Sequence, residues 1–208
     1  EPIDFKVCEV TDLGGVDDKS FNQLAWKGVT DAVDQLGVEG KVLESQQQTD
    51  YESNINAFVE EECDMILGIG FLLADVVTAA SAANPEIKFG IVDVDWVAAD
   101  NVAGIMFKAD QGAFLAGYVS AASTQTGKIG TYGGIPLPSV TVFMDGFYMG
   151  AMYYNEVKGT SVEVIGWDPA TPEEGLFTSN FESLEDARNL SITMIDEGVD
   201  IILGVGGP

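Results

Sequence analysis

The sequence predicts an α/β protein built from parallel sheets with helices on both faces. Short apolar runs alternate with segments of helical periodicity along all 208 residues. Each apolar run is continuous rather than alternating, as expected for parallel strands that are buried on both faces. The hydrophobic fraction of 46% is that of a globular chain and not of a disordered acidic tail.

The first part of the chain predicts five strands and four helices. The strands are expected at 5–10, 41–44, 65–70, 89–94 and 102–107, and the helices at 21–36, 50–61, 72–83 and 110–123. Ser20 and Gln23 have the spacing of a capping box at the start of the first helix, and Gly37 is a plausible stop.

The same alternation restarts after a polar segment at 123–127. Strands are expected at 128–134, 161–167 and 200–207, and helices at 140–155 and 184–197. We therefore expect an N-terminal lobe at 1–123 and a second lobe at 124–208. A parallel sheet normally continues from a strand into a helix, so the second lobe is expected to be incomplete, with its C-terminal part missing.

The composition excludes several kinds of chemistry. The chain has 34 acidic and 9 basic residues, a formal charge of −25, and no histidine. A histidine-based nucleophile pair is therefore impossible, two cysteines alone cannot build a four-ligand zinc site, and no metal or cofactor is expected. Nucleic acid and multiply anionic substrates would be repelled, so a neutral or cationic ligand fits better.

Two further features bear on the environment of the chain. No run of roughly 18 apolar residues is present, so no segment is expected to span a bilayer. Cys8 and Cys63 are the two cysteines, and both a disulfide and a pair of buried thiols remain open.

Ligands of open parallel sheets bind beyond the carboxyl ends of the strands. The residues expected there are carboxylates, aromatic rings and glycines, among them Asp12, Phe71, Asp93, Gly206 and Gly207. Such a set suits a ligand with hydrogen-bond donors and an apolar ring face, as in a sugar or a nucleoside. Asp12 and Asp93 could instead cap helices or be solvated.

Two residues at the start of the first helix are expected to face the same edge. Phe21 is a candidate ring wall for the ligand, or else an apolar contact under the preceding loop. Asn22 is a candidate polar contact, or else an ordinary residue of the first turn. Asp17 and Asp18 are interpreted as structural, since carboxylates favour a helix N-terminus.

The segment TDLGGVDDKSFNQLAWKG resembles the opening signature of the basic membrane protein family, the substrate-binding lipoproteins of ABC importers that include purine nucleoside receptors. The resemblance continues in order through PEIKFGIVD, NVAGIMFKADQGAFLAGYVSA and TGKIGTYGGIPLPSV to GVDIILGVGG. It implies a fold like that of type I periplasmic binding proteins, in which two α/β lobes close on a ligand. It also implies a non-enzymatic, monomeric receptor for a nucleoside, with a purine nucleoside favoured, that serves a membrane permease from an extracytoplasmic, lipid-anchored position.

The resemblance also assigns roles to residues. Phe21 matches a phenylalanine that stacks on the base, Asp12 and Asn22 match polar residues beside it, and Asp93 matches the aspartate after the fourth strand. Phe181 resembles the second stacking wall, with Phe177 and Trp167 as fallback candidates, and Gly206 or Gly207 would approach the ribose. The family has a further aspartate and a lysine beyond the segment that matches this sequence, so the site in this sequence is expected to be incomplete.

Three other readings compete. Asp93 and Asp95 match the nucleophile motif of haloacid dehalogenase-type phosphatases, which would use Mg²⁺. A dinucleotide enzyme is disfavoured because the GGVDDKS loop lacks the G-x-G-x-x-G pattern. A sugar receptor of the same architecture is the nearest alternative.

Overall fold

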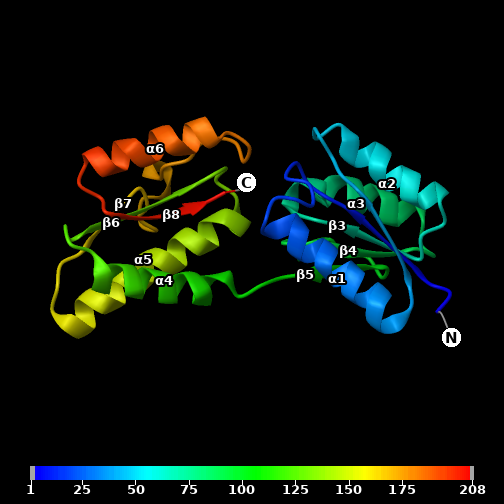
Figure 1. The fold of residues 1–208 in the computed structure, drawn as a ribbon, viewed down its shortest axis with the longest axis horizontal. Coiled ribbons are helices and arrows are strands. Elements are labelled where there is room, and N and C mark those ends of the chain that lie inside the picture. The colour runs from blue at the N-terminus through cyan, green and yellow to red at the C-terminus, as the bar shows by residue number, and fades with distance from the viewer. Residues whose placement is uncertain (1–2, 207–208) are drawn as a thin grey trace. The chain divides into compact units, whose positions relative to one another are not determined.

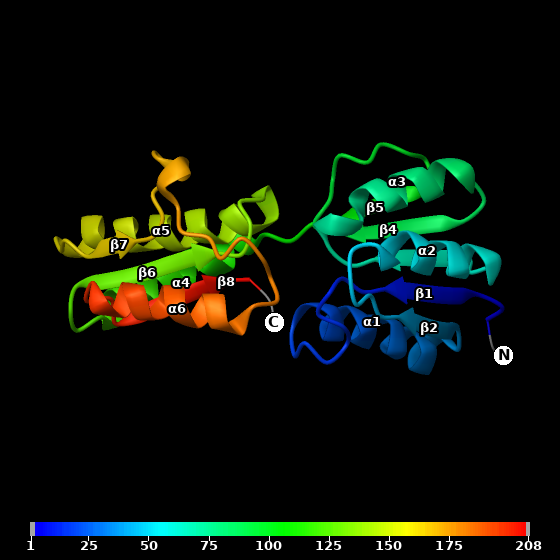
Figure 2. The ribbon, with the colours of Figure 1, turned by 90° about the horizontal axis from the view of Figure 1, so that it is seen from above.

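The computed structural model describes residues 3–206 and confirms the α/β fold. The chain forms two compact units, and the division falls between Phe107 and Lys108. Each unit is a parallel sheet with helices on both of its faces (Figures 1 and 2). Among the described residues, no helix is long and apolar enough to cross a membrane.

The first unit contains a five-stranded parallel sheet in the order β2-β1-β3-β4-β5. Helix α1 covers one face, and α2 and α3 cover the other (Figure 1). The strands are β1 (Lys6–Val10), β2 (Glu39–Leu43), β3 (Met65–Gly68), β4 (Lys88–Val92) and β5 (Val102–Ile105). The helices are α1 (Phe21–Leu36), α2 (Asp50–Glu60), η1 (Phe71–Leu73, one turn of 3-10 helix) and α3 (Ala74–Ala83).

Two strands of this sheet end earlier than the sequence predicts. β3 was expected to reach residue 70 and β4 to reach residue 94, but they end at Gly68 and Val92. Gly70 has φ +102° and Asp93 has φ +64°, and a left-handed residue cannot continue a strand. These two turns place the following residues at the carboxyl edge of the sheet.

A disulfide between Cys8 of β1 and Cys63, which precedes β3, decides the question that the sequence left open. Both cysteines are buried in the core between the sheet and helices α2 and α3. Their Cα atoms lie 6.2 Å apart, within the range that a disulfide spans. The bond therefore ties strand β1 to a segment 55 residues further along the chain, just before the neighbouring strand β3.

The second unit contains a three-stranded parallel sheet in the order β7-β6-β8. Helices α4 and α5 cover one face and α6 covers the other (Figure 1). The strands are β6 (Lys128–Gly133), β7 (Glu163–Ile165) and β8 (Ile201–Val205). The helices are α4 (Ala109–Ser123), α5 (Pro138–Lys158), η2 (Pro172–Glu174) and α6 (Leu184–Asp196).

Helices α4 and α5 are in backbone contact through glycines. A Cβ atom built on Gly117 would lie 1.9 Å from the Phe147 carbonyl oxygen, and one built on Gly150 would lie 2.0 Å from that of Phe114. Only glycine permits this approach, because any side chain would overlap the facing backbone. We call this glycine contact between the two helices the α4–α5 seam. It fixes α4 to the second unit.

The boundary between the two units differs from the one that the sequence predicts. The sequence placed the division at residues 123 and 124, on the grounds that 123–127 is polar. The structure divides the chain at Phe107 and Lys108, one helix earlier. The cause is the α4–α5 seam, since a helix that interlocks with α5 belongs to the same compact unit as α5.

Candidate functional site

The carboxyl edge of the first sheet brings several of the predicted residues together. Asp12 follows β1, and Gly70 follows its neighbour β3. A Cβ atom built on Gly70 would lie 3.2 Å from the Phe21 ring and 3.5 Å from the Asp12 carboxylate. Phe21 and Asp12 therefore flank Gly70, and an aromatic ring and a carboxylate share one small area of this edge.

Asn22 holds the Asp12 carboxylate in place. Its side-chain amide donates a 2.6 Å hydrogen bond to Asp12 Oδ1, and the Asp12 main-chain amide donates to Asn22 Oδ1 at 3.1 Å. Asn22 is 1% exposed, so these bonds are made in a desolvated setting, where polar groups need their partners. Asp12 Oδ1 also accepts from the Gly14 amide at 3.0 Å, which orients the carboxylate further.

Asp18, and not Ser20, caps helix α1. The Ser20 side chain makes no capping bond, whereas the Asp18 carboxylate accepts from the backbone amides of Ser20, Asn22 and Gln23 at 2.8–3.1 Å. Burial acts to raise the pKa of Asp18, but these hydrogen bonds and one from the Asn22 side chain outweigh it and lower that pKa. The predicted capping box is therefore wrong, and the structural role predicted for Asp18 is confirmed.

Asp93 stands at the same edge, directly after β4. Its backbone has φ +64°, an unfavourable conformation for a residue with a side chain, and its amide donates to the Ile105 carbonyl at 2.9 Å. Partial burial raises the pKa of the Asp93 carboxyl group. Strained backbone at a strand end that carries a half-buried carboxylate is typical of functional sites.

An exposed aromatic side chain that the sequence analysis missed lies beside Phe71. The rings of Phe71 and Trp96 have centroids 5.0 Å apart and are tilted by 54°. Trp96 belongs to the loop between β4 and β5, three residues after Asp93. The sequence analysis used Asp95 of this loop in the phosphatase motif and drew nothing from Trp96, although a tryptophan just beyond a strand end was an available signal.

The second unit has a corresponding cluster around Phe181. A Cβ atom built on Gly134 would lie 2.3 Å from the Phe181 ring, and one built on Gly206 would lie 3.7 Å from that ring. Gly134 follows β6 and Gly206 follows β8, so Phe181 lies at the carboxyl edge of this sheet. Gly207 lies outside the described residues.

Of the two fallback candidates for the second aromatic wall, Trp167 is a core residue and Phe177 is half-buried beside it. Trp167 is 5% exposed, and its indole donates a 2.9 Å hydrogen bond to Asp145. The Phe177 ring meets Trp167 edge to face, with centroids 6.0 Å apart. Phe181 is half-buried as well and differs from both in lying against Gly134 and Gly206 at the strand ends.

The structure contradicts the strand geometry that the phosphatase interpretation requires. It required Asp93 and Asp95 on one face of a strand, but β4 ends at Val92 and the left-handed turn at Asp93 breaks the alternation. Within residues 3–206, no group of three or more acidic or cysteine side chains is arranged to hold a metal ion.

Glu9 is a buried carboxyl group that no sequence feature singled out. It lies in the middle of β1 at 0% exposure, and neither carboxyl oxygen has a hydrogen-bond partner among residues 3–206. Burial, reinforced by the charge of Asp18, raises the pKa of Glu9 to about 8. Glu9 is therefore largely protonated in the folded protein at neutral pH.

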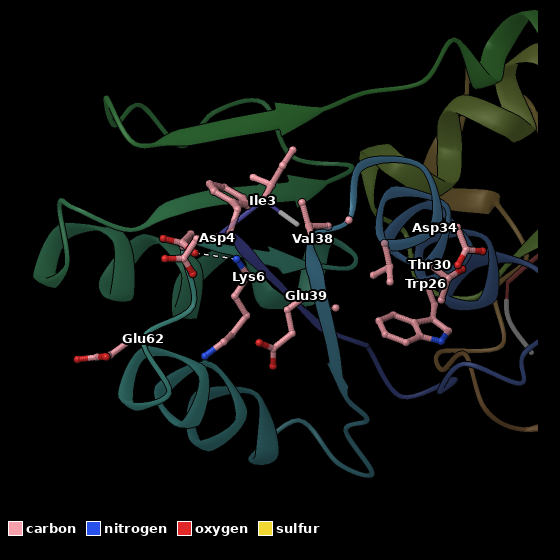
Figure 3. Close-up of a pocket in the computed structure, with 14 residues that line it drawn as sticks. Ile3, Asp4, Lys6, Trp26, Thr30, Asp34, Val38, Glu39 and Glu62 are labelled. Carbon is pink, nitrogen blue, oxygen red and sulfur yellow. Dashed lines mark hydrogen bonds between the residues drawn. The ribbon is translucent and has the colours of Figure 1, made fainter. Parts of the chain in front are cut away.

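An open groove of about 1090 Å³ lies at the opposite end of the first unit, around the start of β1 and β2 (Figure 3). Its lining includes Trp26, Glu39 and Lys6, whose backbone amide donates to Asp64 at 2.7 Å. None of the predicted ligand residues within 3–206 lines it. The groove and the carboxyl-edge cluster are thus separate features.

Comparison with protein families gives one match over nearly the whole chain. Residues 5–208 match the model described as ABC transporter substrate-binding protein PnrA-like. The CD4+ T-cell-stimulating antigen of Listeria monocytogenes is 34% identical over 209 residues, which cover 98% of this chain and 55% of that protein. The ABC transporter nucleoside-binding protein BmpA of Lactococcus lactis is 29% identical over 98% of this chain and 56% of its own length. The chain therefore spans about half the length of these curated relatives.

Solved structures show the same fold. An ABC transporter solute-binding protein from Aeropyrum pernix superposes with a TM-score of 0.82 and 28% identity, over 98% of this chain and 55% of that one. An arabinose-binding protein from Geobacillus stearothermophilus superposes with a TM-score of 0.70 over 97% of this chain and 66% of its own, at 13% identity. The second similarity supports the fold alone.

Proposed function

Because this chain belongs to the PnrA-like family of ABC transporter substrate-binding proteins, we propose that it captures a nucleoside, and specifically a purine nucleoside, for a membrane permease. The family consists of binding proteins and not of enzymes, and we extend this to the present chain. One relative, the Lactococcus lactis protein, is named as nucleoside-binding, which supports the choice of ligand.

The cluster of Phe21, Asp12 and Gly70 carries this proposal. An aromatic ring offers a face on which a base stacks, and a carboxylate beside it accepts hydrogen bonds from ring N–H or ribose hydroxyl groups. Gly70 has no side chain, which keeps the space between Phe21 and Asp12 open. Asn22 fixes the direction of the carboxylate, so little ordering remains to be done when the ligand binds.

The remaining assigned residues complete the proposed contacts. Asp93 and Phe71 would contact the ligand from the same edge of the first unit, and Phe181 would stack on it from the second unit. Gly206 and Gly207 would offer backbone groups to the sugar. Ligand contacts with both units would favour a closed arrangement, which the permease would recognise. Nothing in this scheme requires a cofactor or a reaction.

We also propose an extracytoplasmic location with a lipid anchor, and a monomeric state. The Cys8–Cys63 disulfide supports this location, because disulfides form and persist in oxidising compartments.

The charge of −25 supports an uncharged ligand, since an anion would be repelled on approach.

The test is a melting-temperature screen of the protein against purine nucleosides, pyrimidine nucleosides, free bases and sugars, followed by calorimetry. A ligand that binds only the folded state raises the melting temperature as its concentration exceeds Kd. Phe21→Ala should weaken purine nucleoside binding by about 1–3 kcal/mol, the value of stacking on an aromatic ring. Phe143→Ala, at an exposed position of α5, is the matched control. If only pentoses or hexoses raise the melting temperature, the proposal of a nucleoside receptor is wrong and the protein is a sugar receptor instead.

A further inference from the structure

We propose that Trp96 is a further ligand-contacting residue, whose indole extends the aromatic surface of the first unit beyond Phe21. This inference rests on the proposed function, because it concerns the same carboxyl edge and the same ligand. It assigns a role to a residue that neither the sequence patterns nor the family resemblance singled out.

Trp96 is exposed in a way that packing does not explain. Its side chain is 51% exposed, although its neighbours Val94 and Val97 are turned toward the core. One face of the indole contacts Phe71 at a centroid separation of 5.0 Å. The half of the indole that remains open beside the Phe71 ring is a surface on which a ligand can pack.

The loop that carries Trp96 is firmly positioned. The left-handed turn at Asp93 starts it, and the Asp93 amide is bonded to the Ile105 carbonyl of β5 at 2.9 Å. A Cβ atom built on Gly104 would lie only 2.2 Å from the Val94 carbonyl oxygen, so the loop lies directly against β5. Trp96 is therefore presented from a fixed backbone, which lowers the entropic cost of a ligand contact.

The order of the strands places the rings in a row. Phe21 lies beside Asp12 after β1, Phe71 follows β3, and Trp96 lies in the loop that follows β4, while β1, β3 and β4 are successive neighbours in the sheet. Two strand spacings amount to roughly 10 Å. A ligand with two linked ring systems, such as a base and its sugar, can reach along such a row, whereas a single small ring cannot. Trp96 would contact the part of the ligand that extends beyond Phe21.

The experiment compares Trp96→Ala, Trp96→Phe and the control Trp26→Phe in the whole protein, with guanosine and adenosine as probes. Trp26 lines the groove at the opposite end of the sheet, so its replacement should leave affinity unchanged. We expect Trp96→Ala to raise Kd by roughly tenfold, whereas Trp96→Phe keeps a ring and raises Kd by less than about threefold.

Tryptophan fluorescence gives a second readout that does not depend on Trp96→Ala folding well. The chain has three tryptophans. Nucleoside binding should change the emission of the unaltered protein and of Trp26→Phe, and this change should be lost or strongly reduced in Trp96→Phe.

The outcomes separate the two proposals. If both probes bind but Trp96→Ala binds as tightly as the unaltered protein and Trp96→Phe keeps the fluorescence change, the role of Trp96 is refuted and the nucleoside receptor stands. If neither probe binds the unaltered protein, the proposed function falls, and the assignment of Trp96 falls with it.

Discussion

Asn22, in the first turn of α1, and Asp12, just after β1, are joined by two hydrogen bonds. The Asn22 side-chain amide donates to Asp12 Oδ1 at 2.6 Å, and the Asp12 main-chain amide donates to Asn22 Oδ1 at 3.1 Å. The pair links a residue of the helix to a residue at the strand end. Its geometry makes Asn22 a positioning residue for the carboxylate that is proposed to contact the ligand.

Replacing Asn22 by alanine should therefore affect both stability and binding. The bonds to Asp12 and Asp18 would be lost from a buried position, which costs about 1–3 kcal/mol of unfolding free energy. Nucleoside affinity should fall as well, because the Asp12 carboxylate is no longer oriented. Urea unfolding and calorimetry measure the two effects, with Asn189→Ala on the exposed face of α6 as control. Unchanged affinity in a folded Asn22→Ala variant would contradict the positioning role.

Asp93→Gly should make the protein more stable and a weaker binder. Glycine adopts the φ of +64° without strain, whereas another residue pays about 1 kcal/mol or more for it. Loss of the carboxylate should lower nucleoside affinity. Asp93→Asn, which keeps the shape and removes the charge, separates the two effects. A lower melting temperature for Asp93→Gly than for the unaltered protein would show that the carboxylate is structural.

Glu9 should make stability depend on pH. Its pKa rises from 4.5 to about 8 on folding, so the folded state holds this proton more tightly than the unfolded chain does. The associated stability is fully present below pH 4.5 and is lost as the pH rises to about 8. Glu9→Gln removes the titration, so its unfolding free energy relative to the unaltered protein should rise through this window. Glu156→Gln, on the exposed side of α5, is the control, and a flat difference curve for Glu9→Gln would refute the prediction.

The disulfide should contribute strongly to the stability of the first unit. Closing a loop of 55 residues lowers the entropy of the unfolded chain and is worth about 4 kcal/mol in the chain-entropy model. The double variant Cys8→Ala with Cys63→Ala should lower the urea midpoint, and a reducing agent should lower the midpoint of the unaltered protein but not that of the variant. Since the chain has two cysteines, the reductant has no other target. Equal midpoints with and without reductant would count against a stabilising bond.

Salt should stabilise the protein. With 34 acidic and 9 basic residues, the carboxylates far outnumber the cations of the chain, and most of them repel one another. Raising KCl from about 0.01 M to 1 M shortens the Debye length from roughly 30 Å to 3 Å and screens this repulsion. The melting temperature should rise steeply over this range, and sucrose at equal osmolarity is the control for excluded-solute effects. A melting temperature that is independent of KCl would refute the prediction.

Most of the fold could be predicted from the sequence, because continuous apolar strands and helical periodicity are local signals. Strand ends were less accurate, since the runs MILGIG and FGIVDV extend past Gly68 and Val92, where the strands end, as far as the positive-φ residues Gly70 and Asp93. The domain boundary was missed because α4 is rich in small residues that suit packing on either unit. The spacing of Gly146 and Gly150 in α5 was the available signal for a close helix partner.

The candidate site was predicted unevenly. The DDKSFNQ segment indicated Phe21 and Asn22, and the structure places both near Asp12. The capping residue was misassigned because Asp18 and Ser20 are both good caps, and only the loop geometry distinguishes them. Cysteine pairing and the Phe71–Trp96 contact depend on tertiary distances, which no local pattern encodes.

The glycine seam between α4 and α5 also decides where a probe of lobe motion must be attached. A dye on α4 would report with the second unit, because the seam makes α4 and α5 one rigid block. An energy-transfer pair with one dye on α4 and the other on α5 would show no change during the proposed closure. A pair that is meant to follow closure needs its first dye before Phe107.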